Sequence, residues 1–258
     1  MPQTNNPDKI YRQYQQNTQE FQFDKTVADV FSDMIKRSVP GYENIVEMIG
    51  VLTQAHAQQD SHCYDLGCSL GASTLAIIHN LGDKNCQVIG VDNSAAMVEK
   101  CLNNLNKIKT NINYQIECQD VLEIDFKPAS VIVLNFTLQF IPLEYRDDLL
   151  RKIYNALLPG GILILSEKIQ FSDTYKNELF TDIHHAFKKT QGYSDLEISQ
   201  KRNALENVLI PETKETHLNR LQNAGFEHSD LWFQCLNFAS FFAIKNTTKN
   251  TIKSTINN

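Results

Sequence analysis

The stretch that most constrains the fold is a short β-like run that leads into a glycine turn and then into a helical pattern, over residues His62–Ser73. Gly67 can adopt a positive φ or allow a close approach that a Cβ would block. Gly71 lets the following helix pack closely on the strand. Asp65 lies at the carboxyl end of the predicted strand, where open α/β sheets bind their ligands. This arrangement lets backbone amides approach a ligand, although a tight turn without a ligand has the same pattern.

A second predicted strand, over residues 86–92, is an apolar run that ends in an acid. Asp92 lies about 20 to 25 residues beyond the glycine turn, the spacing at which a second-strand carboxylate reaches a ribose diol in nucleotide-binding βαβ units. Asn93 follows it, and either Asn93 or Ser94 can also cap the next helix. The turn is not the G-x-G-x-x-G of dinucleotide-binding domains. An aspartate before a Gly-x-Ser-x-Gly turn resembles the loop with which Rossmann-like methyltransferases bind S-adenosyl-L-methionine (SAM).

Strand-like and helix-like segments alternate after this point. Five predicted strands cover residues 62–66, 86–92, 113–118, 130–136 and 162–167, and predicted helices cover 72–80, 94–105 and 143–157. A helical insertion over 168–211, a helix over 213–224 and two closing strands over 229–236 and 238–245 follow. The alternation predicts a parallel doubly wound sheet, and the short last connection predicts an antiparallel hairpin. We therefore expect an α/β, Rossmann-like class I methyltransferase fold with a seven-stranded, mostly parallel sheet.

The sequence predicts one domain. Residues 1–21 and 246–258 are polar and poor in large aliphatic side chains, so we expect a flexible tail on each side of a single domain over 22–245. Within the domain, a first helix begins at Asp24, which has the side chain of an N-cap. The turn that follows this helix, over residues 37–42, either folds over the ligand cleft or is an ordinary connection.

Composition limits the classes of partner. The chain has 258 residues and a formal net charge of −6, which argues against autonomous nucleic-acid binding, because affinity for polyanions comes from clustered Lys and Arg. Its six cysteines form no C-x-x-C pair, which favours reduced thiols in a cytoplasmic protein. We see no signal peptide, and no run of about 18 apolar residues that would span a membrane. The adjacent His184 and His185 would point about 100° apart on a helix, so we expect no metal site.

Four further positions each have two interpretations. Asp120 can accept the adenine amino group while the backbone N–H of Val121 pairs with a ring nitrogen, or it is a solvated loop acid. Asn135 closes the apolar fourth strand and either contacts the methionine part of SAM or forms a turn. Cys68 is a small loop residue rather than a nucleophile, because the sequence places no base beside it. Arg202, in the insertion, is either a solvated helix charge or a bidentate carboxylate ligand.

Several stretches together go beyond the general methyltransferase pattern. They are Phe31–Tyr42, Tyr64–Gly71, Val133–Phe140, Gly192–Arg202 and Ala224–Cys235. Over roughly residues 22–245, the chain closely resembles the bacterial carboxy-S-adenosyl-L-methionine (carboxy-SAM) synthases. The Ser-Val-Pro-Gly-Tyr and Glu-Ile-Ser-Gln-Lys-Arg motifs look specific to that family, and only the two tails depart from its pattern.

This resemblance implies that the protein converts SAM and prephenate into carboxy-SAM and phenylpyruvate. A partner enzyme, a tRNA carboxymethyltransferase, would then use carboxy-SAM to modify a wobble uridine, so this protein need not bind nucleic acid itself. The family looks homodimeric, with the insertion at the subunit interface. By the same resemblance, the residues of the SAM or carboxy-SAM site are Tyr42, Gly67, Cys68, Ser69, Asp92, Asn93, Asp120, Val121, Asn135 and Arg202.

Two of these residues would act in catalysis. Arg202 would hold the new carboxylate of carboxy-SAM, and Tyr42 would donate a second hydrogen bond to it. The protein would otherwise supply proximity and exclude water. The sequence leaves open whether Arg202 serves its own subunit or the neighbouring one, how prephenate sits, and whether Glu167 or Lys168 takes part.

Two other functions fit the sheet and the glycine loop. An ordinary SAM-dependent methyltransferase acting on a small molecule or RNA would leave the Arg-bearing insertion unexplained. A non-catalytic SAM-binding module would bind its ligand without turnover. The second alternative is disfavoured by an intact set of polar site residues: Asp65, Asp92, Asp120, Asn135 and Arg202.

Overall fold

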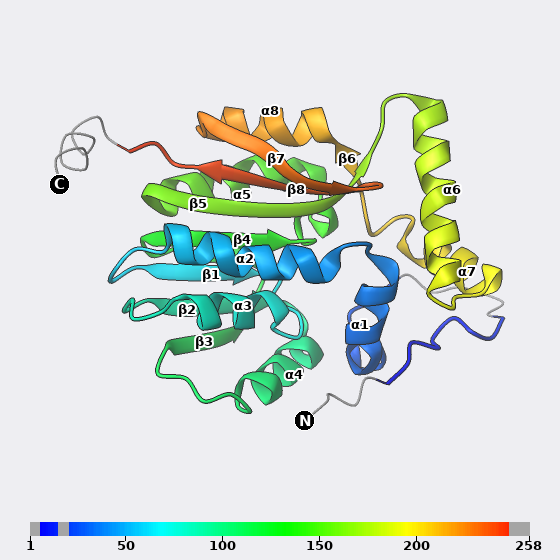
Figure 1. Ribbon diagram of the computed structural model, residues 1–258, viewed down its shortest axis with the longest axis horizontal. Coiled ribbons are helices and arrows are strands. Elements are labelled where there is room, and N and C mark those ends of the chain that lie inside the picture. The colour runs from blue at the N-terminus through cyan, green and yellow to red at the C-terminus, as the bar shows by residue number, and fades with distance from the viewer. Residues whose placement is uncertain (1–5, 15–20, 248–258) are drawn as a thin grey trace.

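The structure is a computed structural model that describes residues 6–14 and 21–247 (Figure 1). Its strands are β1 (His62–Leu66), β2 (Gln87–Asp92), β3 (Asn113–Cys118), β4 (Ala129–Asn135), β5 (Leu157–Gln170), β6 (Glu212–Thr213), β7 (His228–Cys235) and β8 (Phe238–Ile244). Its α-helices are α1 (Lys25–Ser38), α2 (Tyr42–His56), α3 (Ala72–Asn80), α4 (Ala95–Leu105), α5 (Leu143–Ala156), α6 (Thr174–Thr190), α7 (Asp195–Leu205) and α8 (Lys214–Ala224). Two 3₁₀ turns, η1 (Val121–Glu123) and η2 (Leu138–Phe140), follow β3 and β4.

The main sheet has the strand order β3-β2-β1-β4-β5-β8-β7. The first five strands in this order are parallel, whereas β8 runs antiparallel to both β5 and β7. The predicted doubly wound sheet with a closing antiparallel hairpin is therefore confirmed. The two-residue strand β6, which was not predicted, pairs with the end of β5 outside this order.

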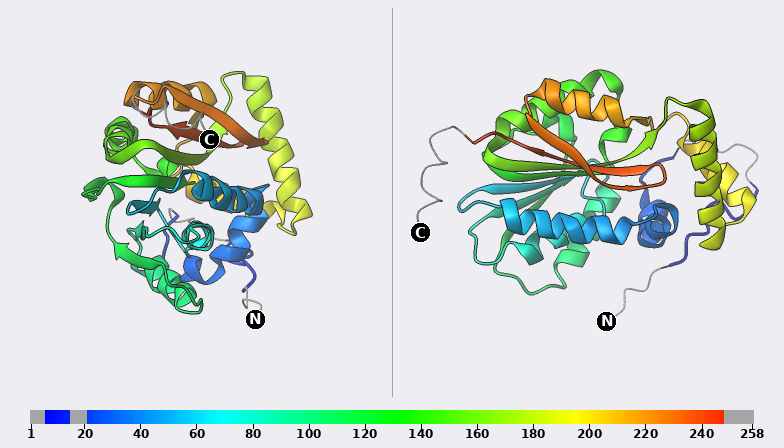
Figure 2. Two further views of the ribbon diagram at one scale, coloured as in Figure 1. Left: turned by 60° about the vertical axis from the view of Figure 1, so that its left-hand side comes forward. Right: turned by 45° about the horizontal axis from the view of Figure 1, so that its top comes forward.

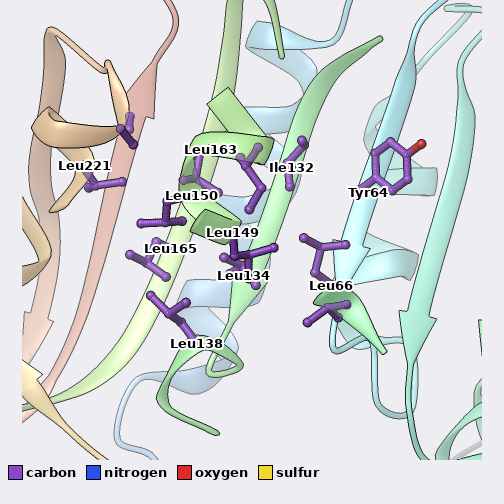
Figure 3. Packing of buried hydrophobic residues seen from close by; sticks show 14 of the residues in the cluster. Tyr64, Leu66, Ile132, Leu134, Leu138, Leu149, Leu150, Leu163, Leu165 and Leu221 are labelled. Carbon is purple, nitrogen blue, oxygen red and sulfur yellow. The ribbon is translucent and has the colours of Figure 1, made fainter. Parts of the chain in front are cut away.

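Helices cover both faces of the sheet (Figure 1). One face packs against α2, α3 and α4, and the other packs against α5 and α8. Side chains alternate between these two cores along each strand: Tyr64 and Leu66 face α5 and α8, while Cys63 lies in the opposite core. Figure 3 shows how leucines of α5, β4 and β5 interdigitate on the face that α5 and α8 cover. Strands β4 and β5 are buried on both faces, as their continuous apolar runs predicted.

Local capping explains where the helices near the site begin and end. The Asp24 carboxylate accepts a hydrogen bond from the amide of Val27 and begins α1, as predicted. The same helix ends at Ser38 because Val39, which precedes a proline, is extended (φ −116°, ψ 104°). Ser94 likewise caps α4. These caps fix the directions in which α1 and α4 meet the edge of the sheet.

Strand β5 is longer than predicted. The predicted strand begins at residue 162, whereas β5 begins at Leu157 and runs through the Pro-Gly-Gly segment over residues 159–161. The amide of Gly160 donates to the carbonyl of Lys245 at 2.8 Å, and the amide of Lys245 donates to the carbonyl of Gly161 at 2.9 Å. Pairing with the chain beyond β8 supplies hydrogen bonds that a local turn would otherwise make.

The insertion stands beyond the carboxyl ends of the parallel strands, where α6 and α7 lie beside α1 (Figure 2). Residues 6–14, which we had placed in a flexible tail, pack against this region. Asp8 is only 2% exposed, and its carboxylate accepts a hydrogen bond from the Tyr193 hydroxyl at 2.5 Å. The rest of the two predicted tails, apart from residues 21, 246 and 247, lies outside the described residues. In the part of the chain that is described, no helix is long and apolar enough to cross a membrane.

Candidate active site at the carboxyl edge of the sheet

A cavity of about 650 Å³ lies at the carboxyl ends of β1, β2 and β4, with α1, α2, α6 and α7 around it. The structure brings together in its wall all but one of the ten residues predicted for the ligand site. Those lining it are Tyr42, Gly67, Cys68, Ser69, Asp92, Asn93, Asp120, Val121 and Asn135. The exception is Arg202.

The glycine loop is held against the end of β2. The amides of Gly67 and Cys68 both donate to the carbonyl of Val91, at 2.8 and 2.9 Å. Gly67 has φ +76°, and a Cβ there would come within 2.3 Å of the Thr137 hydroxyl oxygen. Because both the backbone conformation and the space exclude a side chain, Gly67 is required for this loop.

Asp92 is placed as a hydrogen-bond acceptor at the floor of the cavity. One carboxylate oxygen accepts from the Ser69 amide at 2.8 Å, and the other accepts from the Ser94 amide at 2.9 Å. The side chain is nearly buried, at 9% exposed, which raises its pKa. Each carboxylate oxygen has a further lone pair, so Asp92 keeps the capacity to accept hydrogen bonds from a ligand.

Asn135 carries an unsatisfied acceptor. Its Nδ2 donates to the Ser73 hydroxyl at 3.1 Å, but its buried Oδ1 has no hydrogen-bond partner among the described residues. A buried amide oxygen without a donor costs free energy. The side chain lines the cavity, so a ligand with a donor group there would satisfy it.

The thiol of Cys68 is protected from ionisation. It is 3% exposed, and contact with Cys101 together with burial raises its pKa. A thiol with a raised pKa is a poor nucleophile, which agrees with the prediction of a loop role for Cys68. Burial also raises the pKa of Tyr42, which therefore remains a phenol able to donate a hydrogen bond.

The end of the cavity nearest the insertion is basic. Lys168 at the end of β5, Lys188 on α6 and Lys201 on α7 all line it, together with His184. Burial lowers the pKa of His184 to about 3, so this ring is neutral, and its Nε2 is 2.8 Å from the carbonyl oxygen of Ser38. The positive charge at this end therefore comes from the three lysines.

Arg202 does not line this cavity in its own chain. It is exposed, and after burial and the charge of Lys188, its charge contributes to lowering the pKa of the neighbouring His185 on α6. The adjacent residue, Lys201, faces the cavity instead and is only 6% exposed. Successive residues on a helix point in different directions, so the two basic residues of this motif serve different surfaces.

Comparison with known proteins shows the family to which this chain belongs. A model described as a methyltransferase domain matches residues 64–161. A carboxy-S-adenosyl-L-methionine synthase from Hahella chejuensis is 57% identical over 243 residues, which cover 92% of this chain and 98% of that protein. A second, from Aliivibrio fischeri, is 52% identical over 93% of this chain and 99% of its own length. The chain belongs to the carboxy-S-adenosyl-L-methionine synthase family.

Solved structures of other proteins have a fold similar to that of this synthase family member. A putative S-adenosyl-L-methionine-dependent methyltransferase from Methanococcus maripaludis matches with a TM-score of 0.58 and 21% identity, covering 91% of this chain and 99% of that one. Human N-acetylserotonin methyltransferase, in complex with SAM, matches with a TM-score of 0.57 and 15% identity, covering 86% and 56%. At these identities the likeness concerns the class I methyltransferase fold alone.

The sequence leaves open whether Glu167 or Lys168 takes part in the reaction, and the structure of this synthase family member places the two residues differently. The Glu167 carboxylate is buried and accepts hydrogen bonds from the amides of Leu138 and Gln139, at 3.0 and 2.8 Å, so it holds η2 in place. Burial raises its pKa to about 8. Lys168, the next residue, lines the cavity.

Among residues 6–14 and 21–247, no group of three or more His, Cys, Asp or Glu side chains is placed to hold a metal ion.

Sequence reasoning missed Lys188 and Lys201. A usable signal existed for each of them. Lys201 immediately precedes Arg202 in a motif already singled out, and Lys188 lies one helical turn after His184 on α6. Neither spacing indicates which side of the helix faces the cavity, because that depends on how α6 and α7 pack over the sheet.

Proposed function

We propose that this protein makes carboxy-SAM and phenylpyruvate from SAM and prephenate. The observation that carries the proposal is the close relation to carboxy-S-adenosyl-L-methionine synthases, at 50–57% identity and over nearly the whole chain. The cavity supports it, because acceptor groups line one end and ammonium groups line the other. Acceptors suit the hydroxyl and ammonium groups of SAM, and ammonium groups suit a dianion such as prephenate.

We expect the residues at the acceptor end to bind different parts of SAM. Asp92 would accept the ribose hydroxyls, and Asp120 with the amide of Val121 would bind the adenine edge. The free Oδ1 of Asn135 would accept from the ammonium of the methionine part. Gly67, Cys68, Ser69 and Asn93 would shape the floor beneath the nucleoside, and the Tyr42 hydroxyl would lie near the reacting sulfonium.

The proposed reaction balances without a metal or an external base. SAM supplies a methyl group whose protons the adjacent sulfonium acidifies. Prephenate loses carbon dioxide and hydroxide as its ring becomes aromatic. The hydroxide takes a methyl proton to form water, and the methyl carbon takes up the carbon dioxide. The protein would hold the two reactants together and exclude water, so that hydroxide and carbon dioxide react before they escape.

A direct test is mass spectrometry of the small molecule released when the purified protein is denatured. We expect a species heavier than SAM by one carbon dioxide. Release of SAM or S-adenosylhomocysteine alone, from cells that make prephenate, would favour an ordinary methyltransferase. Release of no nucleoside, with no binding of added SAM, would contradict the site assignment itself.

We also propose that two copies of the chain associate through the insertion. Three apolar side chains, Tyr175, Leu179 and Ile183, are 75%, 42% and 42% exposed along one face of α6. Helix α7, which carries Arg202, contacts α6. A second copy bound to this face would cover the apolar stripe and would place one chain's Arg202 near its partner's cavity.

Arg202→Ala is expected to weaken carboxy-SAM binding by roughly 30-fold, since a charge-assisted pair to the new carboxylate would be lost. Binding of SAM, which lacks that carboxylate, should change less than about threefold. Calorimetry with both ligands measures this difference, and Asn203→Ala at the adjacent exposed position is the matched control. Equal loss for both ligands would mean that Arg202 has only a structural role.

The remaining parts of the proposal concern the cell. All six cysteines are free thiols, which supports a reducing compartment such as the cytoplasm. Carboxy-SAM would leave this protein for a tRNA carboxymethyltransferase that modifies a wobble uridine. The net charge of −6 supports a role upstream of tRNA rather than on it.

A further inference from the structure

The charges in the cavity wall are unevenly compensated. Lys201 has a counter-ion, because its Nζ lies 3.7 Å from the Asp8 carboxylate and donates to the Ser38 hydroxyl at 3.0 Å. Lys188 is 8% exposed, yet in the described residues its Nζ has neither a hydrogen bond nor a salt bridge. The Nζ of Lys168, on the neighbouring β5, is likewise without a partner there. The cavity therefore contains two ammonium groups without counter-charge.

Keeping such charges largely buried without a counter-ion costs free energy. Burial, together with repulsion from Lys201 and Lys168, lowers the pKa of Lys188 to about 7. Burial lowers the pKa of Lys201 to about 8 and also lowers that of Lys168. A buried ammonium without an anion destabilises a fold, and a hydrophobic side chain of the same length would remove that cost. The arrangement is therefore better suited to receiving an anion than to stabilising the chain.

We propose that Lys188 and Lys168 form the receptor for the carboxylates of the dianionic co-substrate, with Lys188 as the principal contact. This inference rests on the proposed function and assigns its second substrate to named residues. Lys168 lines the cavity from the end of β5, and Lys188 lines it from α6. The site is separate from Arg202, which is exposed on the outer side of its own chain and which we assign to the carboxylate of the product.

Binding at this receptor should depend on pH. The titratable groups around Lys188 are Lys168 from β5, Lys201 from α7, and His184 and His185 on its own helix, with Asp8 beyond Lys201. His184 stays neutral above its lowered pKa of about 3, burial also lowers the pKa of His185, and Lys201 titrates near 8, so Lys188 is the first of these lysines to lose its proton as the pH rises through 7. Its ammonium form is present below about pH 7 and is lost above it. Affinity for the dianion should therefore fall as pH rises from 7 to 9.

The test is Lys188→Met, measured as the KM for prephenate and as the dissociation constant of prephenate in the presence of S-adenosylhomocysteine. We expect both to rise roughly 10- to 100-fold, while SAM affinity changes less than about twofold. The fall in affinity between pH 7 and pH 9 should become smaller, and the part that remains should come from Lys201. Because the variant removes a buried charge, its Tm should not lie below that of the wild type. Lys188→Arg, which keeps the charge, should retain most of the affinity.

Lys189→Met is the matched control. Lys189 is the next residue on α6, is 51% exposed and pairs with Asp195 at the surface, so its loss should leave prephenate binding unchanged. Unchanged KM and affinity in Lys188→Met would overturn the receptor assignment. Failure of the wild type to make carboxy-SAM would overturn the proposed function instead. In that case, equal prephenate binding by wild type and Lys188→Met would overturn the receptor as well, and weaker binding by the variant would support it.

Discussion

Asp92→Ala is expected to weaken SAM binding by about 100-fold. The wild-type carboxylate would accept charge-assisted hydrogen bonds from the ribose hydroxyls, and each such bond contributes about 1.5–3 kcal/mol. The substitution also removes the acceptors for the amides of Ser69 and Ser94, which hold the glycine loop to the start of α4. Affinity is lost both through the missing contact and through a loop that is less well fixed.

Titration calorimetry with SAM measures this effect, and two further variants make it specific. Asp92→Asn keeps one acceptor and the side-chain volume, so it should bind with intermediate affinity and remain folded. Asp83→Ala removes an exposed carboxylate far from the cavity wall and should bind as the wild type does. An Asp92→Ala protein that binds SAM within about threefold of wild type would show that the ribose is held elsewhere.

Arg146→Ala is expected to lower the free energy of unfolding by about 3–5 kcal/mol, because it breaks a buried ion pair, removes three hydrogen bonds to carbonyl oxygens and leaves Arg220 as the remaining cationic partner of Glu212. Arg146 is fully buried at 0% exposed, and its guanidinium pairs with Glu212 at 2.5 Å. It also donates to three carbonyl oxygens, those of Ile141, Gln139 and Ile210. Two of these belong to the segment around η2 that lines the cavity, so the loss should loosen the site as well.

Urea unfolding monitored by circular dichroism measures the change. Arg151→Ala is the control: it lies on the same helix, its side chain is 59% exposed, and its surface pair with Asp148 contributes little. We expect it to change the free energy of unfolding by less than about 0.5 kcal/mol. The account would be contradicted if Arg146→Ala destabilised the protein no more than Arg151→Ala does. In that case the hydrogen bonds and ion pair of Arg146 would not be what holds Glu212 of β6 against the cavity wall.

The sheet and the corner of the cavity that contains the glycine loop and Asp92 could be predicted because their signals are local. The run from His62 to Ser73 contains its own strand, turn and helix start, and Asp92 closes a strand whose pairing follows from the alternation of elements. Asn135 could be found in the same way, because a polar residue at the end of an apolar strand is visible in the sequence. Such features need no knowledge of distant partners.

The parts that could not be predicted depend on partners distant in the sequence. Residues 6–14 look like a polar tail, but Asp8 is bound by Tyr193, which lies 185 residues further along the chain. The Pro-Gly-Gly segment of β5 carries a local turn signal that is overridden by pairing near Lys245. Lys188 faces the cavity only because α6 packs over the edge of the sheet. No periodicity within the insertion indicates that orientation.

The measurement that tests the account most directly is turnover with SAM and prephenate carrying carbon-13 in its ring carboxylate. Liquid chromatography with mass spectrometry follows both products. We predict carboxy-SAM and phenylpyruvate in equal amounts, with the carbon-13 label in carboxy-SAM. Formation of S-adenosylhomocysteine and a methylated acceptor, with no labelled carboxy-SAM, would contradict the account and would identify an ordinary methyltransferase.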